Sequence, residues 1–102
     1  MPGYTGYSAS KAGLVGLAKG LALDLAPAGI TANVVAPGWF DSPLAEPWKH
    51  NPELEAGVLG HTAQRRWGAA TDLAGAYLFL ASDASAFVTG IVFNVDGGYL
   101  LV

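Results

Sequence analysis

Apolar residues recur at helical spacing near the start of the chain. Between residues 7 and 26 they form a stripe made of Leu14, Leu17, Ala18, Leu21, Ala22 and Leu25. Small residues occupy a second face of the same segment, namely Ala9, Ala12, Gly13, Gly16 and Gly20. Glycine inside a helix costs up to about 1 kcal/mol relative to alanine, so this face indicates close packing against a sheet or a partner helix. The pattern predicts one helix over residues 7–26, with Thr5 as its N-cap and Pro27 beyond its end.

Two short apolar runs predict β-strands, and a second helix lies between them. The first strand covers residues 30–36 and stops at Pro37, and the second covers residues 91–95. Asn33 lies inside the first strand, where we expect a structural side-chain hydrogen bond. The second helix is predicted from a cap at Thr71, with Asp72 in its first turn, to about residue 82.

The segment between the first strand and the second helix, residues 39–67, has no simple periodicity. It contains three prolines, and residues 53–60 favour a short helix. Disordered segments are poor in aromatics, whereas this one contains Trp39, Phe40 and Trp48. We therefore predict an ordered or partly mobile lid. The order helix, strand, lid, helix, strand predicts a parallel βαβ unit, whose two sheet faces both need cover.

The composition is unusually apolar, which predicts that much of the surface is covered by other protein. The 102 residues are 52% hydrophobic and only 13% charged, so we expect another subunit or a missing part of the protein to hide part of this surface. The net charge of −3 argues against non-specific nucleic-acid binding. The sequence has no cysteine, which excludes disulfides and thiolate metal sites and fits the cytoplasm. His50 and His61 lack cysteine partners, and we expect no metal site. Neither a secretory signal nor a membrane-spanning run is visible.

Tyr7 and Lys11 are the first candidates for chemistry. Four residues apart in a helix, they lie on one face, one turn apart. A nearby ammonium group and the positive end of a helix both favour a phenolate, so the pair suits acid–base work near neutral pH. Spacing alone favours an amphipathic surface turn over an acid–base pair.

Five motifs, in order, resemble the C-terminal part of a short-chain dehydrogenase/reductase. They are Gly-Tyr-Ser-Ala-Ser-Lys at 6–11, Ile-Thr-Ala-Asn-Val-Val-Ala-Pro-Gly at 30–38, Phe-Asp-Ser-Pro at 40–43, Arg-Trp-Gly at 66–68 with Asp-Leu-Ala at 72–74, and residues 79–98 ending in Val-Asp-Gly-Gly. The resemblance covers essentially the whole chain. It implies an α/β fold, the C-terminal portion of a Rossmann-type doubly wound parallel sheet whose N-terminal strands are missing.

The resemblance also implies roles for individual residues. Tyr7 matches the family's catalytic acid/base, and Lys11 matches the lysine that hydrogen-bonds the nicotinamide ribose and helps the tyrosine ionise. Pro37 and Gly38 match the turn against which the nicotinamide of NAD or NADP lies. The backbone of Phe40 and the hydroxyl of Ser42 match contacts to the carboxamide; relatives commonly carry threonine at the latter position.

The resemblance also implies that the loop after Ser42 is the lid of the substrate pocket. Its wall candidates are Trp39, Leu44, Trp48 and Leu54. Lys49, His50 and His61 could attract a carboxylate, or could simply form a solvated loop edge. The motifs look most like members acting on sugar acids such as gluconate, with 3-oxoacyl reductases close behind. The reaction implied is hydride transfer between nicotinamide and a secondary alcohol or ketone.

Several family features have no counterpart in residues 1–102. The glycine-rich pyrophosphate turn is absent, and so are the catalytic serine and asparagine expected upstream of Tyr7. We therefore expect residues 1–102 to be the C-terminal half of one NAD(P)-binding domain, with a truncation or a late start codon at Met1 and a natural end at Val102. Such a fragment is expected to be inactive alone.

A non-catalytic reading stands beside the enzymatic one. The chain could be a truncated remnant or an oligomerisation module, because helix 7–26 and the C-terminal helix–strand pair resemble the family's oligomer interfaces. Full-length relatives are commonly tetramers. The expected partners are therefore a small-molecule substrate and further copies of the chain, with neither nucleic acid nor membrane.

Overall fold

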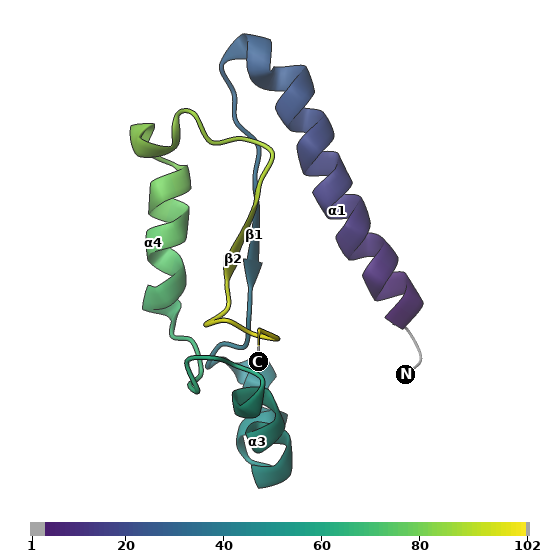
Figure 1. The fold of residues 1–102 in the computed structure, drawn as a ribbon, viewed down its shortest axis with the longest axis vertical. Coiled ribbons are helices and arrows are strands. Elements are labelled where there is room, and N and C mark those ends of the chain that lie inside the picture. Colours follow the sequence, from purple (N-terminus) through teal and green to yellow (C-terminus); the bar gives the residue numbers. More distant parts are fainter. Residues whose placement is uncertain (1–3, 102) are drawn as a thin grey trace. The chain divides into compact units, whose positions relative to one another are not determined.

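The structure, a computed structural model, describes residues 4–101. The elements follow the order α1 (Tyr4–Leu25), β1 (Val34–Pro37), α2 (Glu46–Lys49), α3 (Pro52–Gly60), α4 (Ala70–Leu80) and β2 (Val92–Val95) (Figure 1). Short 3-10 turns cover Ala26–Ala28, Pro43–Ala45 and Asp83–Ser85. The predicted order of helix, strand, lid, helix and strand is confirmed. The expected start at Met1 and end at Val102 lie outside the described residues.

β1 and β2 are neighbours in a parallel two-stranded sheet. The residue numbers of the bonded partners increase in the same direction on both sides, as they do in a parallel pair. The bonds run from Gly90 N–H to Ala32 O (2.8 Å), from Val34 N–H to Ile91 O (2.9 Å) and from Gly38 N–H to Val95 O (2.9 Å). The predicted α/β class with a parallel sheet is therefore confirmed.

Both strands start later than predicted because side chains replace the ladder at their beginnings. The N–H of Ala32 donates to the hydroxyl of Thr89 at 3.1 Å. The Asn33 amide donates to Val88 O at 3.2 Å and accepts from Ile91 N–H at 3.2 Å. The expected structural hydrogen bond of Asn33 is thus present, and it joins the entrances of the two strands.

Two of the predicted helix caps are wrong. α1 begins at Tyr4, so Thr5 lies inside its first turn. α4 begins at Ala70, which places Thr71 inside the helix as well. At that end the carboxylate of Asp72 accepts the Ala69 N–H at 2.7 Å and does the capping.

The lid is ordered and contains two helices. α3 begins one residue earlier than predicted, because the Asn51 side chain accepts from the N–H groups of Glu53 and Leu54 at 3.1 and 3.3 Å. α2 was not predicted, since four residues carry too little periodicity to be recognised.

The described residues divide into two compact units, one made of residues 4–34 and 79–93 and the other of residues 35–78 and 94–101. In the first unit Ala18 and Ala22 of α1 are buried, and Gly90 packs against Ala22. The leucines of the α1 stripe are less buried than its alanines, with Leu14, Leu17 and Leu21 at 53, 59 and 40% exposure. Within residues 4–101, no other segment comes within 4 Å of a side chain built at Gly13, Gly16 or Gly20.

The second unit has a small core of its own. Ala45, Val58 and Ala76 are buried, together with Thr62, whose hydroxyl donates to Val58 O at 2.8 Å. Thr62 also pairs with Tyr99 through an isolated antiparallel bridge. This contact ties the end of the lid to the C-terminal segment.

Candidate functional site

Tyr7 and Lys11 meet on the N-terminal part of α1. The Lys11 ammonium donates to the Tyr7 hydroxyl at 3.3 Å and lies 5.5 Å from the centre of its ring. Both side chains are exposed, Tyr7 at 61%. The one-turn spacing therefore brings the phenol and the ammonium together as the sequence predicts. Tyr7 stands near the N-terminus of α1, where the helix dipole is positive.

Pro37 and Gly38 form the turn that ends β1, and glycine is required there. A Cβ at Gly38 would lie 2.6 Å from the Cβ and 2.7 Å from the Cα of Asp96, so no side chain fits. The Gly38 N–H donates to Val95 O at 2.9 Å. Close backbone approach thus fixes the course of the chain just before the candidate nicotinamide contacts.

Phe40 extends the strand direction by an isolated parallel bridge to Gly68. The Gly68 N–H donates to Trp39 O at 2.9 Å, and the Asp41 N–H donates to Gly68 O at 2.8 Å. Because backbone groups alternate in direction along an extended segment, the N–H and C=O of Phe40 itself point away from Gly68. Its ring packs on Gly68, where an added Cβ would come within 2.7 Å of Cε2. The ring is therefore anchored on Gly68, and the N–H and C=O of Phe40 are left out of this bridge.

Ser42 starts the 3-10 turn that follows. Its backbone is extended, with φ −152° and ψ 166°, and its carbonyl accepts the Ala45 N–H at 2.9 Å. The hydroxyl does not cap that turn, and the residue is half-buried. The hydroxyl is thus compatible with the predicted ligand contact.

Trp39 is the centre of an aromatic cluster made of Trp39, Trp48, Trp67 and Tyr99. Its ring centre lies 5.2 Å from that of Trp48, 6.2 Å from Trp67 and 6.3 Å from Tyr99. Trp39 and Trp48 were predicted as lid walls, and the structure brings them together. Leu44 and Leu54 are 86 and 47% exposed. Trp67 and Tyr99 escaped sequence reasoning, because no local spacing connects them to Trp39.

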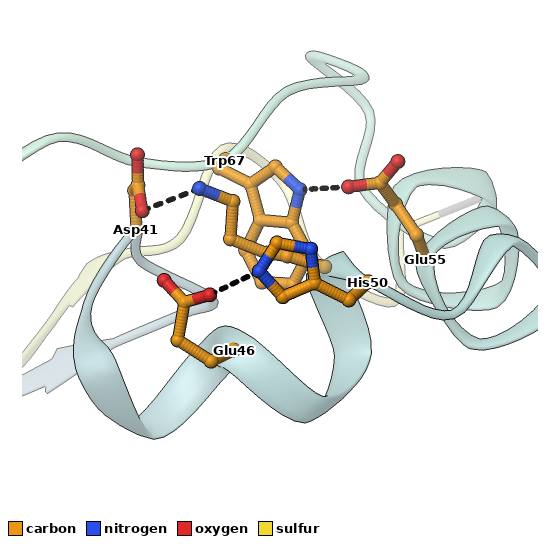
Figure 2. Close-up of polar contacts among 6 residues, drawn as sticks. Asp41, Glu46, His50, Glu55 and Trp67 are labelled. Carbon is orange, nitrogen blue, oxygen red and sulfur yellow. Dashed lines mark hydrogen bonds and ion pairs between the residues drawn. The ribbon is translucent and has the colours of Figure 1, made fainter.

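Polar contacts join different segments of the lid to one another (Figure 2). The Trp67 indole N–H donates to Glu55 at 2.9 Å, His50 pairs with Glu46 one turn away, and the Lys49 ammonium donates to Asp41 at 2.6 Å. His61 contacts the carbonyl of Gly57 at 2.9 Å through Nδ1. The three side chains considered as attractors of a substrate carboxylate, Lys49, His50 and His61, therefore contact oxygens of this chain.

A hollow of about 360 Å³ lies in the second unit, where the two strands end. It is lined by Trp39, Phe40, Gln64, Arg66, Gly68, Asp72 and residues 94–98. Arg66 donates to both carboxylate oxygens of Asp72 at 2.8 and 3.2 Å. This bond, followed by the one from the Ala69 N–H, lowers the pKa of Asp72 to about 2. The bond to Asp72 in turn raises the pKa of Arg66. Next to α4 the hollow is therefore lined by the ion pair of Arg66 and Asp72.

Neither a metal site nor a membrane helix is found in the described part of the chain. Among residues 4–101 no group of His, Asp and Glu is placed to hold a metal ion. Within the same residues no helix is both long and apolar enough to cross a bilayer. The candidate residues are shared between the units, with Tyr7 and Lys11 in the first and Pro37, Gly38, Phe40 and Ser42 in the second.

Known proteins match nearly the whole chain. The family model described as enoyl-(acyl carrier protein) reductase matches residues 1–100. The 3-oxoacyl-[acyl-carrier-protein] reductase FabG of Haemophilus influenzae is 45% identical over 100 residues, which are 98% of this chain and 40% of that protein.

Two solved structures show the same fold. A candidate 2-deoxy-D-gluconate 3-dehydrogenase of Agrobacterium tumefaciens with bound NADP matches with a TM-score of 0.89 and 38% identity, covering 94% of this chain and 39% of that one. A short-chain type dehydrogenase/reductase of Mycobacterium ulcerans gives 0.88 and 34% identity, covering 93% and 34%.

These matches and the fold define the class of protein. The chain belongs to the short-chain dehydrogenase/reductase family, and its α/β structure corresponds to part of that family's Rossmann-type fold. It spans about 40% of the length of the curated relative it matches.

Proposed function

We propose that residues 1–102 form the C-terminal half of one NAD(P)-binding domain in an oxidoreductase. The enzyme transfers a hydride between a nicotinamide cofactor and a secondary alcohol or ketone. The observation that carries this proposal is the contact between the Lys11 ammonium and the Tyr7 hydroxyl on the exposed face of α1. Family membership supports it, because the motif around these residues is the one that the family uses for acid–base chemistry.

In this proposal Tyr7 handles the proton at the substrate oxygen. Its hydroxyl gives a proton to a carbonyl oxygen or takes one from a carbinol, and the Lys11 ammonium beside it stabilises the phenolate. Lys11 also holds the cofactor ribose. The nicotinamide supplies the hydride chemistry when bound, while the protein orients the reactants and excludes water.

The turn after β1 fits the carboxamide end of a nicotinamide. The N–H and C=O of Phe40, which point away from Gly68, offer one donor and one acceptor. The Ser42 hydroxyl lies two residues further on. Pro37 and Gly38 would lie against the ring, and the close contact of Gly38 with Asp96 leaves no room for a side chain at this turn. The Agrobacterium protein named above was solved with bound NADP, which supports NADP or NAD as the cofactor here.

Two substrate classes are supported by the relatives. One relative is named a 3-oxoacyl-[acyl-carrier-protein] reductase, and one structural neighbour is described as a 2-deoxy-D-gluconate dehydrogenase. We propose a sugar acid or a 3-oxoacyl group, with Trp39 and Trp48 in the pocket wall. Leu44 and Leu54 are exposed and would join that wall only when the lid meets its substrate.

A fusion tests the catalytic assignment. The corresponding C-terminal segment of the Haemophilus reductase is replaced by residues 1–102, and NADPH oxidation is followed with 3-oxoacyl and keto-sugar-acid substrates. We expect turnover, and we expect Tyr7→Phe to lower it at least about 100-fold, the usual scale of general acid–base catalysis. Tyr77→Phe, which alters a half-exposed tyrosine of α4, is the matched control. Turnover that survives Tyr7→Phe would contradict the role of Tyr7.

The chain alone should not turn over, because the glycine-rich pyrophosphate turn is not in its sequence. We expect residues 1–102 to leave NADH fluorescence unchanged in a titration. Saturable binding in the micromolar range would refute this. The coding DNA upstream of Met1 gives an independent check, since an in-frame glycine-rich turn there supports the enzyme.

An oligomerisation module is the second candidate function. The specific observation in its favour is the apolar surface of the first unit, where Leu14, Leu17 and Leu21 are exposed and Phe87 is fully exposed. We propose that the chain, or the protein containing it, assembles with further copies through α1 and the α4–β2 segment. An in-frame stop codon upstream of Met1 would favour this non-catalytic reading.

A further inference from the structure

One ammonium group stands among three carboxylates in the lid. Lys49, the last residue of α2, donates to Asp41 Oδ1 at 2.6 Å, and only 26% of its side chain is exposed. The bond to Asp41 raises the pKa of Lys49, and the charges of Asp41, Glu46 and Glu55 raise it further against the effect of burial. Lys49 is thus bonded to Asp41, and Glu46 and Glu55 add negative charge to its surroundings.

The three carboxylates belong to three different segments. Asp41 follows β1, Glu46 opens α2 and Glu55 lies in the first turn of α3. Figure 2 shows that Glu46 is paired with His50, and that Glu55 accepts from the Trp67 indole. The backbone N–H of Asp41 is held in turn by Gly68 O at 2.8 Å. Among the three carboxylates, Asp41 is bonded to Lys49, and this bond links α2 to the segment that follows β1.

Removing this cation would leave the charge of Asp41 without its bonded partner, in a lid that also carries the charges of Glu46 and Glu55. Like charges repel most strongly where solvent screening is incomplete, as around the partly buried Lys49. The repulsion acts between the turn after β1 and the helices α2 and α3. Asp41 lies between Phe40 and Ser42, so a shift of Asp41 moves both candidate carboxamide contacts.

We propose that Lys49 is a positioning residue. It holds α2 against the segment 40–42, and it thereby sets the affinity for the nicotinamide cofactor without touching the cofactor. The effect of Lys49 on cofactor affinity rests on the proposed function, whereas its effect on how the lid is held does not.

Tryptophan emission reports the lid directly, because all three tryptophans of the sequence belong to the aromatic cluster. In low salt we expect Lys49→Met to raise the acrylamide quenching constant of residues 1–102 about two- to fivefold, the range that an exposed ion pair covers. About 1 M NaCl, with a screening length of about 3 Å, should remove most of the rise. Lys49→Arg should keep the wild-type value, and Lys19→Met on α1 is the matched control for loss of an exposed cation.

A double variant separates charge from packing. Asp41→Asn in the Lys49→Met background should bring quenching back toward the wild-type value, because one of the three like charges is gone. Equal quenching of wild type and Lys49→Met in low salt, or an Arg variant as open as the Met variant, would overturn the proposal. If far-UV circular dichroism shows that Lys49→Met is unfolded, the Asp41→Asn/Lys49→Met protein decides: the proposal requires it to be folded.

The fusion described above tests the link to the cofactor. Lys49→Met should raise KM for NADPH about two- to fivefold and leave kcat unchanged, since the residue does not touch the reacting atoms. An unchanged KM in an active fusion would overturn the role of Lys49. A fusion without any turnover would instead count against the proposed function, and the quenching result would still decide how the lid is held.

Discussion

At the residue scale, close contacts decide which glycines can be replaced. Gly38 faces the backbone of Asp96, whereas Gly57 in α3 has open space at the position of a Cβ. The two glycines therefore differ in what a methyl group would meet, although neither needs a positive φ. This contrast leads to the first prediction.

Gly38→Ala should destabilise the chain by about 1–3 kcal/mol, because Asp96 must move to make room. Gly57→Ala should be neutral or stabilising by up to about 1 kcal/mol, since alanine is the better helix former. Urea unfolding of both variants measures the difference. Similar unfolding midpoints would show that the turn yields freely.

Asp72 gives a second prediction, about pH. Its pKa is lowered from 3.8 to about 2 in the folded chain. The bond to Arg66 therefore stabilises the folded chain fully above pH 4, and this stabilisation is lost as the pH falls to 2 and Asp72 is protonated. Asp72→Asn should therefore be less stable than wild type at neutral pH, and the gap should close between pH 4 and pH 2. Unfolding midpoints at several pH values measure it, with Asp24→Asn on α1 as control. A gap that stays constant with pH would contradict this assignment.

How far the sequence could predict a residue's neighbours depended on their distance along the chain. Tyr7 and Lys11 meet because helical spacing alone puts them on one face. The contact of Gly38 with Asp96 and the packing of Trp39 on Tyr99 join segments far apart in sequence, and no local pattern encodes them. The cap at Thr71 was mispredicted because a neighbouring carboxylate can do the same work as a hydroxyl, as Asp72 does. The cap at Thr5 was mispredicted because the helical spacing continues to Tyr4.

At the scale of elements, the two strands are joined at their entrances by one side chain. Asn33 bonds to Val88 O and to the N–H of Ile91, so it fixes the loop before β2 to the start of β1. Sequence reasoning anticipated a structural hydrogen bond at Asn33. Its partners lie 55 and 58 residues away, which is why they could not be named in advance.

Asn33→Ala should cost about 1–3 kcal/mol, because it leaves a partly buried carbonyl and a backbone N–H without their partner. Asn94→Ala, at an exposed position of β2, should cost less than half as much. Asn33→Asp is informative too, since it keeps the acceptor for Ile91 and sets an oxygen against Val88 O. Chemical denaturation ranks the three variants. An Asn33→Ala protein as stable as Asn94→Ala would mean that the link is dispensable.

At the scale of the whole molecule, the exposed leucines of α1 predict self-association. Residues 1–102 should elute from size exclusion with light scattering at a multiple of 10.4 kDa. Leu17→Gln combined with Leu21→Gln should shift the chain toward the monomer, because burying each leucine is worth about 1.5–3 kcal/mol. Leu23→Gln, on the same helix at 78% exposure, serves as control. A monomeric wild type would contradict assembly through this face.

The parallel sheet has a consequence for the life of the chain in a cell. Within the described residues β1 and β2 pair only with each other, so each leaves one row of backbone donors and acceptors uncovered. Such rows recruit any extended segment that arrives first, including another copy emerging from the ribosome. Made on its own, the chain is therefore expected to pair through these edges with other extended segments. Its steady-state amount would then depend on how quickly a covering segment reaches it, more than on the stability of its own helices.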